Sequence, residues 1–251
     1  MKLLLAFALT FSILADAAEP TPTEVKIQAA IDHERRTEAD RERDRNRQPL
    51  KMLSFLGLQD DMQVLELLPG RNGWYTKILG PVLEEKGKLY LSIGANAVGA
   101  MVADKPGFST TEVVPFNSDG ITKSTAEAPR MTVPEFSFGL RKIDMVLTFR
   151  NAHNFDAAGR ANLNAAAFEV LNKGGRYAIV DHTRRHMQPD SAEVWRRLDP
   201  VQVIKEVQAA GFKFVDYSDL HYKPDDELRH EVGRQSVTGN TDRFTLLFEK
   251  P

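Results

Sequence analysis

The 251-residue chain has no cysteine, almost no net charge and only one long hydrophobic run. Without cysteine it can form neither disulfides nor thiolate-based catalytic or zinc sites. Its 33 basic and 35 acidic residues nearly cancel. This balance argues against nucleic acid as the main partner, because binding to backbone phosphates needs a clustered basic excess. The length and the hydrophobic content suit one sizeable α/β domain.

The long hydrophobic run lies at the N-terminus. Residues 3–15 are almost all apolar, follow Met1-Lys2 and end in the small-x-small cleavage pattern Ala15-Asp16-Ala17. This arrangement is typical of a secretory signal peptide at residues 1–17, and it predicts a periplasmic or secreted protein. A membrane anchor is the alternative. Because the apolar core is short for a bilayer and no second span follows, we expect no stable membrane anchor after cleavage.

A charged segment occupies residues 18–49. Between residues 32 and 47 it carries six acids and six bases, with opposite charges recurring at i,i+3. This pattern predicts a solvated helix with weak ion pairs, which Pro49 ends. The alternative is that part of the helix covers a ligand crevice, with Arg43 or Arg47 turned inward.

From residue 50 to residue 251, short apolar runs alternate with longer amphipathic stretches. This rhythm predicts an α/β domain with a Rossmann-like, mostly parallel sheet. Strands are expected at residues 63–68, 88–93, 111–115, 143–149, 175–181, 212–217 and 243–249. Helices are expected at residues 73–84, 95–103, 157–172 and 199–210, the last two ending at Gly174-Gly175 and Gly211. The stretch 117–139 is expected to be a loop.

The most informative stretch is residues 63–79, which indicate a buried strand, a glycine turn and the start of a helix. Glu66 is the single acid in the apolar strand, and Gly70 and Gly73 allow the backbone to turn and approach a ligand. The three-glycine dinucleotide fingerprint is absent. A turn that only connects two elements is therefore an equally good interpretation of this segment alone.

Polar residues also follow two further predicted strands. The strand at 143–149 leads into Arg150, Asn151, His153 and Asn154, and the strand at 175–181 leads into Asp181 and His182. Because ligands bind outside the carboxyl ends of parallel strands, these side chains and Glu66 are expected to converge on one crevice. A loop-capping role is the alternative for each of them.

His182 and His186 have the helical i,i+4 spacing that a pair of metal ligands would need. Asp190 is the only candidate third ligand, Arg184-Arg185 would repel a cation, and Pro189 breaks a helix. We therefore expect no metal. The chain also lacks a G-x-S-x-G nucleophile motif.

Taken in order, several segments resemble an exported bacterial family of class I S-adenosylmethionine-dependent methyltransferases. They span nearly the whole chain after the signal peptide and comprise residues 40–53, 66–76, 148–154, 180–182, 210–212, 241–244 and 250–251. The resemblance implies a seven-stranded sheet whose last strand, at about 243–249, is antiparallel. It also implies S-adenosylmethionine as the cofactor.

The resemblance assigns roles to residues at the strand ends. The expected cofactor-binding residues are Glu66, Pro69, Gly70, Gly73, Trp74, Asn96, Arg150, Asn151 and Asn154. The expected catalytic residues are His153, His182 and Asp181, with one of the histidines as a base for a protonated acceptor.

The expected function is methyl transfer to a small molecule or an envelope component. The alternative is a non-catalytic binding module that keeps the same fold, because the second strand offers only Ser92 and Asn96 where an acid normally binds the ribose. An open pocket framed by Glu66 and the Gly70 turn would favour the enzyme. A pocket filled by Arg71 and Trp74 would favour the binding module.

Overall fold

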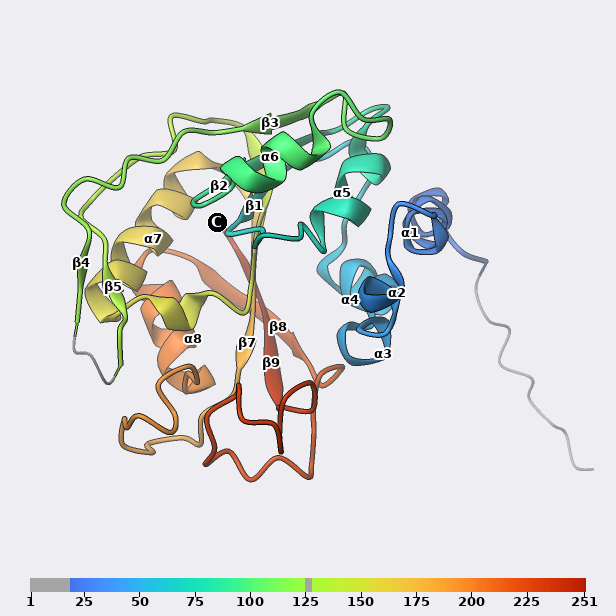
Figure 1. Cartoon of the computed structure of the whole chain (residues 1–251). Helices are drawn as coiled ribbons and strands as arrows, with labels where there is room; N and C mark the ends of the chain where they lie inside the picture. The colour runs from blue at the N-terminus through green and yellow to red at the C-terminus, as the bar shows by residue number, and fades with distance from the viewer. Residues whose placement is uncertain (1–18, 125–127) are drawn as a thin grey trace, which may run out of the picture.

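The computed structural model describes residues 19–124 and 128–251, so the predicted signal peptide at 1–17 lies outside the described residues (Figure 1). The helices are α1 (Pro22–Asp32), α2 (Glu38–Arg41), α3 (Asp44–Arg47), α4 (Pro49–Leu56), α5 (Thr76–Leu83), α6 (Asn96–Val102), the 3-10 helix η1 (Ala152–Asn154), α7 (Ala157–Val170) and α8 (Pro200–Ala209). The strands are β1 (Gln63–Leu67), β2 (Lys88–Ser92), β3 (Thr111–Val113), β4 (Thr122–Lys123), β5 (Met131–Thr132), β6 (Ile143–Phe149), β7 (Leu171–His182), β8 (Lys213–Ser218) and β9 (Arg243–Glu249).

Seven of these strands form one sheet in the order β3-β2-β1-β6-β7-β9-β8. Strands β3, β2, β1, β6 and β7 are parallel to one another, whereas β9 runs antiparallel to both β7 and β8. The predicted mostly parallel sheet, with an antiparallel last strand beside the preceding one, is therefore confirmed.

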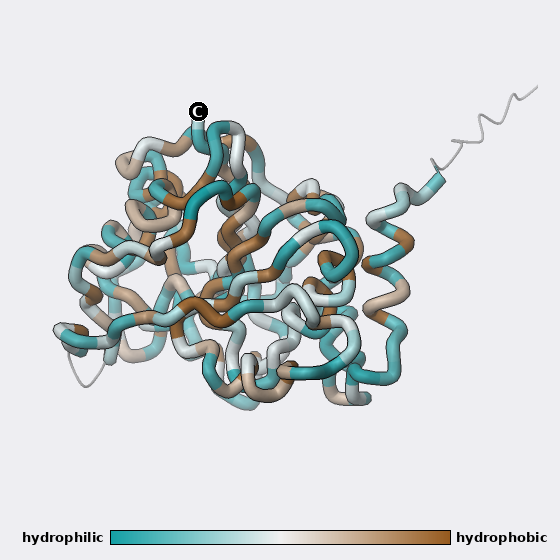
Figure 2. The backbone as a smooth tube through the Cα atoms, turned by 90° about the horizontal axis from the view of Figure 1, so that it is seen from above, coloured by the Kyte–Doolittle hydropathy of each residue, from teal (hydrophilic) through white to brown (hydrophobic). Residues whose placement is uncertain are grey.

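Helices cover both faces of the sheet (Figure 1). One apolar cluster joins the sheet to α1, α4, α5 and α6, and a second joins its other face to α7 and α8. Figure 2 shows the hydrophobic segments gathered inside the molecule. Successive residues of β1 alternate between the clusters, so Val64 packs in the first and Leu65 in the second. Glu66 follows this alternation and lies on the α5 side.

The charged N-terminal segment differs from the predicted single solvated helix. It forms the three helices α1, α2 and α3, because Thr37 caps a new helix and Gln48, at φ 39°, turns the chain before Pro49. Pro49 does not end a helix but begins α4, where proline is well tolerated. Asp40 pairs with Lys77 of α5, and Asp44 pairs with Arg36, so these acids do not use the predicted i,i+3 partners.

The described part of the stretch 117–139 is an irregular crossing, as predicted, apart from the short antiparallel pair β4 and β5. One smaller prediction is wrong. Gly174-Gly175 lies within β7 rather than at a helix end, since α7 stops at Val170 and the chain enters the strand directly. Gly211 does follow the end of α8, at φ 105°. Within residues 19–124 and 128–251, no helix is long and apolar enough to cross a membrane.

Candidate functional site

A cavity of about 610 Å³ opens at the carboxyl ends of β1 and β6. The order of the sheet reverses between these two strands, and open α/β sheets bind ligands at such a switch point. Six of the residues predicted from the sequence line the cavity, namely Glu66, Pro69, Gly70, Trp74, Arg150 and Asn151. The cavity therefore brings together the predicted residues of two strand ends that are more than 80 positions apart in the chain.

Glu66 is the buried acid of the cavity, with 2% of its surface exposed. Its Oε2 accepts a hydrogen bond of 2.7 Å from the Thr76 hydroxyl at the start of α5. Burial raises the pKa of Glu66 to about 7, and the Thr76 hydrogen bond opposes this shift. The carboxyl group is therefore divided between its protonated and charged forms at neutral pH.

The residues that directly follow β1, β2 and β6 have left-handed backbone conformations. Leu68 has φ 50° after β1, Ile93 has φ 58° after β2 and Arg150 has φ 60° after β6. Such angles cost energy in residues with a Cβ and persist where the surroundings enforce them. The Arg150 N–H donates to the Val180 carbonyl over 2.6 Å, which fixes the turn after β6.

Asn151 holds the two strands together at this edge. Its side-chain amide donates to the carbonyl of Leu68 over 2.9 Å and to that of Phe149 over 3.0 Å. Its own Oδ1 accepts a bond from Asn154. Asn154 does not line the cavity and supports Asn151 instead.

Gly70 and Gly73, the two glycines of the turn, play different roles. A Cβ added at Gly70, which has φ 70°, would meet nothing within 4 Å, so the backbone there borders open space. A Cβ added at Gly73 would approach Val98 to 2.8 Å and Met101 to 3.2 Å. Gly73 is thus needed for the packing of α5 against α6, whereas Gly70 is a place where a ligand can approach the backbone.

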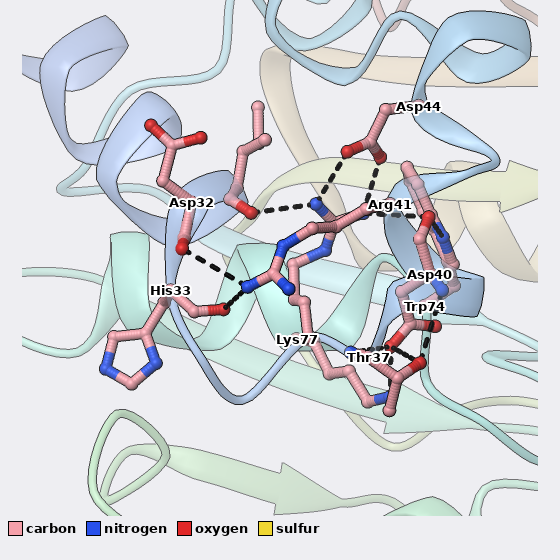
Figure 3. A network of polar contacts seen from close by, with 10 residues as sticks. Asp32, His33, Thr37, Asp40, Arg41, Asp44, Trp74 and Lys77 are labelled. Carbon is pink, nitrogen blue, oxygen red and sulfur yellow. Dashed lines mark hydrogen bonds and ion pairs between the residues drawn. The ribbon is translucent and has the colours of Figure 1, made fainter.

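The short helices α2 and α3 form the wall of the cavity opposite the sheet. The indole N–H of Trp74 donates to the Asp40 carbonyl over 2.9 Å, and the Asp40 carboxylate pairs with Lys77 at 2.7 Å (Figure 3). Arg47 of α3 lies 4.2 Å from the centre of the Trp74 ring. Arg43 and Arg47 both line the cavity, which agrees with the alternative that this segment covers a crevice.

The guanidinium groups of Arg47 and Arg150 give the cavity a positive character. Burial, followed by repulsion from Arg150, lowers the pKa of Arg47 to about 9. Burial also lowers the pKa of Arg150. Both groups still carry charge at neutral pH, because arginine starts from a very high pKa.

A second hollow, of about 230 Å³, lies at the ends of β2 and β3. Asn96, Gly94 and Phe116 are among its lining residues, so Asn96 faces this space rather than the main cavity. Ser92, the other polar residue at the end of β2, is buried, and its hydroxyl donates to the Val114 carbonyl over 3.2 Å. Of Ser92 and Asn96, only Asn96 therefore offers a polar side chain to a ligand in this second hollow.

The three predicted catalytic residues form a buried cluster at the end of β7. The ring Nδ1 of His153 lies 2.6 Å from Asp181, which also accepts the backbone N–H groups of His153 and His182. Asp181 is fully buried, and the two histidines are 5% and 6% exposed. The structure brings them together, as expected, but none of the three lines the cavity.

The two histidines with the spacing of metal ligands have separate partners. His182 ends β7 and its Nδ1 lies 2.9 Å from the Thr241 hydroxyl, whereas His186 Nδ1 lies 2.8 Å from Asp199. The helical spacing assumed from the sequence is absent, because a strand and a turn occupy this stretch. Among the described residues, no group of three potential ligands could hold a metal ion.

Solved structures share the fold of this chain. A SAM-dependent methyltransferase from Aquifex aeolicus matches with a TM-score of 0.56 and 15% identity, over 91% of this chain and 98% of that chain. The chain has the class I methyltransferase fold. No protein-family model and no curated protein matches its sequence.

Two further structures show what this methyltransferase fold can host. The glycopeptide N-methyltransferase MtfA matches with a TM-score of 0.51 and 16% identity, over 80% of this chain and 94% of that one. The 4+2 cyclase SpnF matches with a TM-score of 0.55 and 12% identity, over 94% and 98%. Because one of the similar structures is named a cyclase, the methyltransferase fold by itself does not fix the reaction.

Some residues of the cavity were not expected from the sequence. Tyr75 and Phe149 stack with ring centroids 3.7 Å apart and, with Leu68 and Met101, supply apolar lining. In the sequence they are ordinary core residues of the turn, the helix and the strand. They border a ligand space because they lie at the switch point of the sheet. The switch point can be located only when the strand order is known.

Proposed function

We propose that the protein is an S-adenosylmethionine-dependent methyltransferase that acts on a small molecule or an envelope component. The observation that carries the proposal is the open cavity at the switch point, bordered by Glu66 and by the free space over Gly70. Trp74 and Arg71 do not fill this space, because both are part of its lining. The methyltransferase names of two structures with the same fold support the same function.

The chemistry of the lining residues fits this cofactor. The carboxyl group of Glu66 suits the amino group of the methionine part. The hollow with Asn96 and Phe116 suits the ribose and the flat adenine ring. When bound, the cofactor supplies an electrophilic methyl group, and the protein contributes by orienting the acceptor toward it.

The buried cluster at the end of β7 suits a positioning role. His153 and His182 lie outside the cavity lining, so neither side chain reaches an acceptor in this conformation. Asp181 ties the backbone of η1 to β7 through His153. We propose that these residues hold the turn that carries Arg150 and Asn151, and that proton removal by His153 would require a movement of this turn.

The second candidate function is a binding module without chemistry. One observation favours it: the hydroxyl of Ser92 is already engaged with Val114, so the end of β2 offers no acid and no free hydroxyl for a ribose. The proposal of an exported protein makes this alternative relevant, since the cofactor is made in the cytosol. Cell fractionation with and without residues 1–17 tests the export.

Calorimetric titration of the protein from residue 18 onward, with S-adenosylmethionine and with S-adenosylhomocysteine, tests the function. We expect binding in the micromolar range, about −8 kcal/mol. Glu66→Ala should weaken it by about 1.5–3 kcal/mol, the value of a charge-assisted hydrogen bond. Glu135→Ala is the matched control, because Glu135 is exposed and does not line either space. No binding at millimolar ligand would leave the binding module as the better explanation.

A further inference from the structure

The main cavity holds more positive charge than its acids can neutralise. Arg43, Arg47 and Arg150 all line it. Arg47 is only 5% exposed, yet within the described residues no carboxylate forms an ion pair with any of these three arginines. Buried charges are normally paired, because leaving water is costly for an ion. The missing partner is therefore the feature that needs an explanation.

The nearby acids are occupied or only partly charged. Asp40 lines the cavity, but its carboxylate pairs with Lys77 at 2.7 Å and accepts the Thr37 N–H at 3.0 Å. Asp181 is engaged by His153. Glu66 has a pKa raised by burial to about 7, so it supplies less than a full negative charge at neutral pH. None of these groups can balance three guanidinium groups.

The side chain of Arg47 and the backbone of Arg150 are held in place. Arg47 stacks on the Trp74 ring at 4.2 Å, and its carbonyl accepts a bond from His221 at 3.0 Å. The backbone of Arg150 is fixed by its bond to Val180. Their mutual repulsion is thus retained in the folded protein. A site arranged in advance in this way binds an anion at a small entropic cost.

S-adenosylmethionine cannot supply the missing charge. It carries a sulfonium, an ammonium and one carboxylate, so its net charge is positive, and binding it adds to the excess. The cavity then still lacks a counter-charge. The acceptor is the remaining component that can provide it, and its anionic group would also be drawn to the site by the field of the arginines.

We propose that the cavity holds an anionic group of the methyl acceptor, a phosphate or a carboxylate, between Arg47 and Arg150, with Arg43 at its rim. That the anion belongs to an acceptor rests on the proposed function, whereas the anion site itself does not. Guanidinium groups suit both anions, because their planar donors match two oxygens at once. The acceptor class is therefore acidic rather than cationic or neutral.

The test is calorimetric titration of the protein from residue 18 onward with inorganic phosphate and, separately, with malonate. We expect saturable binding that Arg150→Gln weakens about tenfold or more, as for loss of a charged hydrogen-bond partner. Arg43→Gln, at an exposed position on the rim, should weaken it several-fold without threatening the fold. The control is Arg45→Gln, because Arg45 of α3 is exposed and does not line the cavity. It should leave the affinity unchanged.

Competition with cofactor analogues shows whether the arginines bind an anion of the acceptor or the carboxylate of the cofactor. We expect phosphate to bind equally well when the cofactor site is saturated with S-adenosylhomocysteine. Competition with S-adenosylhomocysteine but not with 5′-methylthioadenosine, which lacks the amino-acid part, would show that the arginines bind the cofactor's carboxylate and would overturn the proposal. Failure of both anions to bind, or equal binding by all three variants, would also overturn it. Arg150-dependent phosphate binding without any S-adenosylhomocysteine binding would keep the anion site and refute the methyltransferase.

Discussion

His221 Nε2 lies 3.0 Å from the carbonyl oxygen of Arg47, which is 174 positions earlier in the chain. Its other nitrogen, Nδ1, lies 2.7 Å from the Thr245 hydroxyl of β9. Nε2 must donate to the carbonyl, and because burial lowers the pKa of His221 to about 4, the ring is neutral at pH 7 and its Nδ1 accepts from Thr245. The carbonyl of Asn46 also accepts a bond from Arg243. The C-terminal strand thus determines where Arg47 stands in the cavity wall.

Replacing His221 should therefore destabilise the protein. His221→Phe fills a similar volume but leaves the Arg47 carbonyl and the Thr245 hydroxyl without partners in a buried place. We expect the free energy of unfolding to fall by about 1–3 kcal/mol, measured by urea denaturation. His33→Phe is the control, because His33 is exposed, and it should change stability little. Equal effects of the two substitutions would refute this account.

The lowered pKa of His221 also predicts that the stability of the protein depends on pH. Burial lowers the pKa of His221 from 6.5 to about 4. Between these values the unfolded chain binds more protons than the folded protein, so the contribution of His221 is complete above pH 6.5 and is lost as the pH falls toward about 4. In His221→Phe this part of the acid sensitivity should be absent from denaturation curves recorded across that window.

Glu66 should have the opposite effect on stability. Its folded pKa is about 7 against 4.5 unfolded, so the folded protein binds more protons and loses stability as the pH rises through this range. Glu66→Gln should therefore be more stable than the wild type at pH 8, by up to about 3 kcal/mol, and equal to it at pH 4. The same variant should bind S-adenosylhomocysteine more weakly. Glu135→Gln, at an exposed site, should change neither property; a loss of stability in Glu66→Gln at pH 8 would contradict the raised pKa.

The two glycines of the turn offer a paired test. Both have positive φ, so alanine should strain each by about 1–2 kcal/mol. Gly73→Ala must in addition displace Val98, which a Cβ would approach to 2.8 Å, so its loss in thermal stability should be the larger. Gly70→Ala adds a methyl group at the open space and should mainly reduce ligand affinity. The reverse ranking in stability would contradict the roles assigned to the two positions.

Substitution of His153 tests whether this residue has a structural or a catalytic role. His153→Ala removes the ring that lies 2.6 Å from the fully buried Asp181. Removing one partner of a buried pair should cost about 3 kcal/mol of stability, while the folded fraction keeps its affinity for S-adenosylhomocysteine. His153→Gln, which can still donate to Asp181, should recover part of the loss. Normal stability with abolished turnover would instead make His153 the base.

The sequence was most informative where a local pattern is compatible with only one kind of secondary structure. The apolar runs at 63–67, 143–149 and 243–249 became strands close to the expected bounds, because a strand buried on both faces shows itself as a short continuous run. The charged segment was harder. Alternating charges fit a solvated helix, and nothing local reveals that Asp40 and Arg47 find Lys77 and Trp74 as distant partners.

The candidate site was predictable in part for the same reason. Polar residues directly after strands mark a sheet edge, so Glu66, Arg150 and Asn151 could be grouped from their positions in the chain. Two features could not be foreseen. The side chains of His153 and His182 turn into a buried cluster, and the hydroxyl of Ser92 is taken by Val114; both depend on contacts across the sheet.

By itself, the sequence determined the α/β class, the strands and the residue types available at their ends, because hydrophobic period and chain-local turn chemistry act over a few residues. Only the tertiary structure decided which of those ends meet in one cavity, which acids are neutralised and which arginines stay unpaired. These properties depend on burial and on charge interactions between residues far apart in the chain, such as Arg47 and Arg150, and local pattern contains no information about such distances.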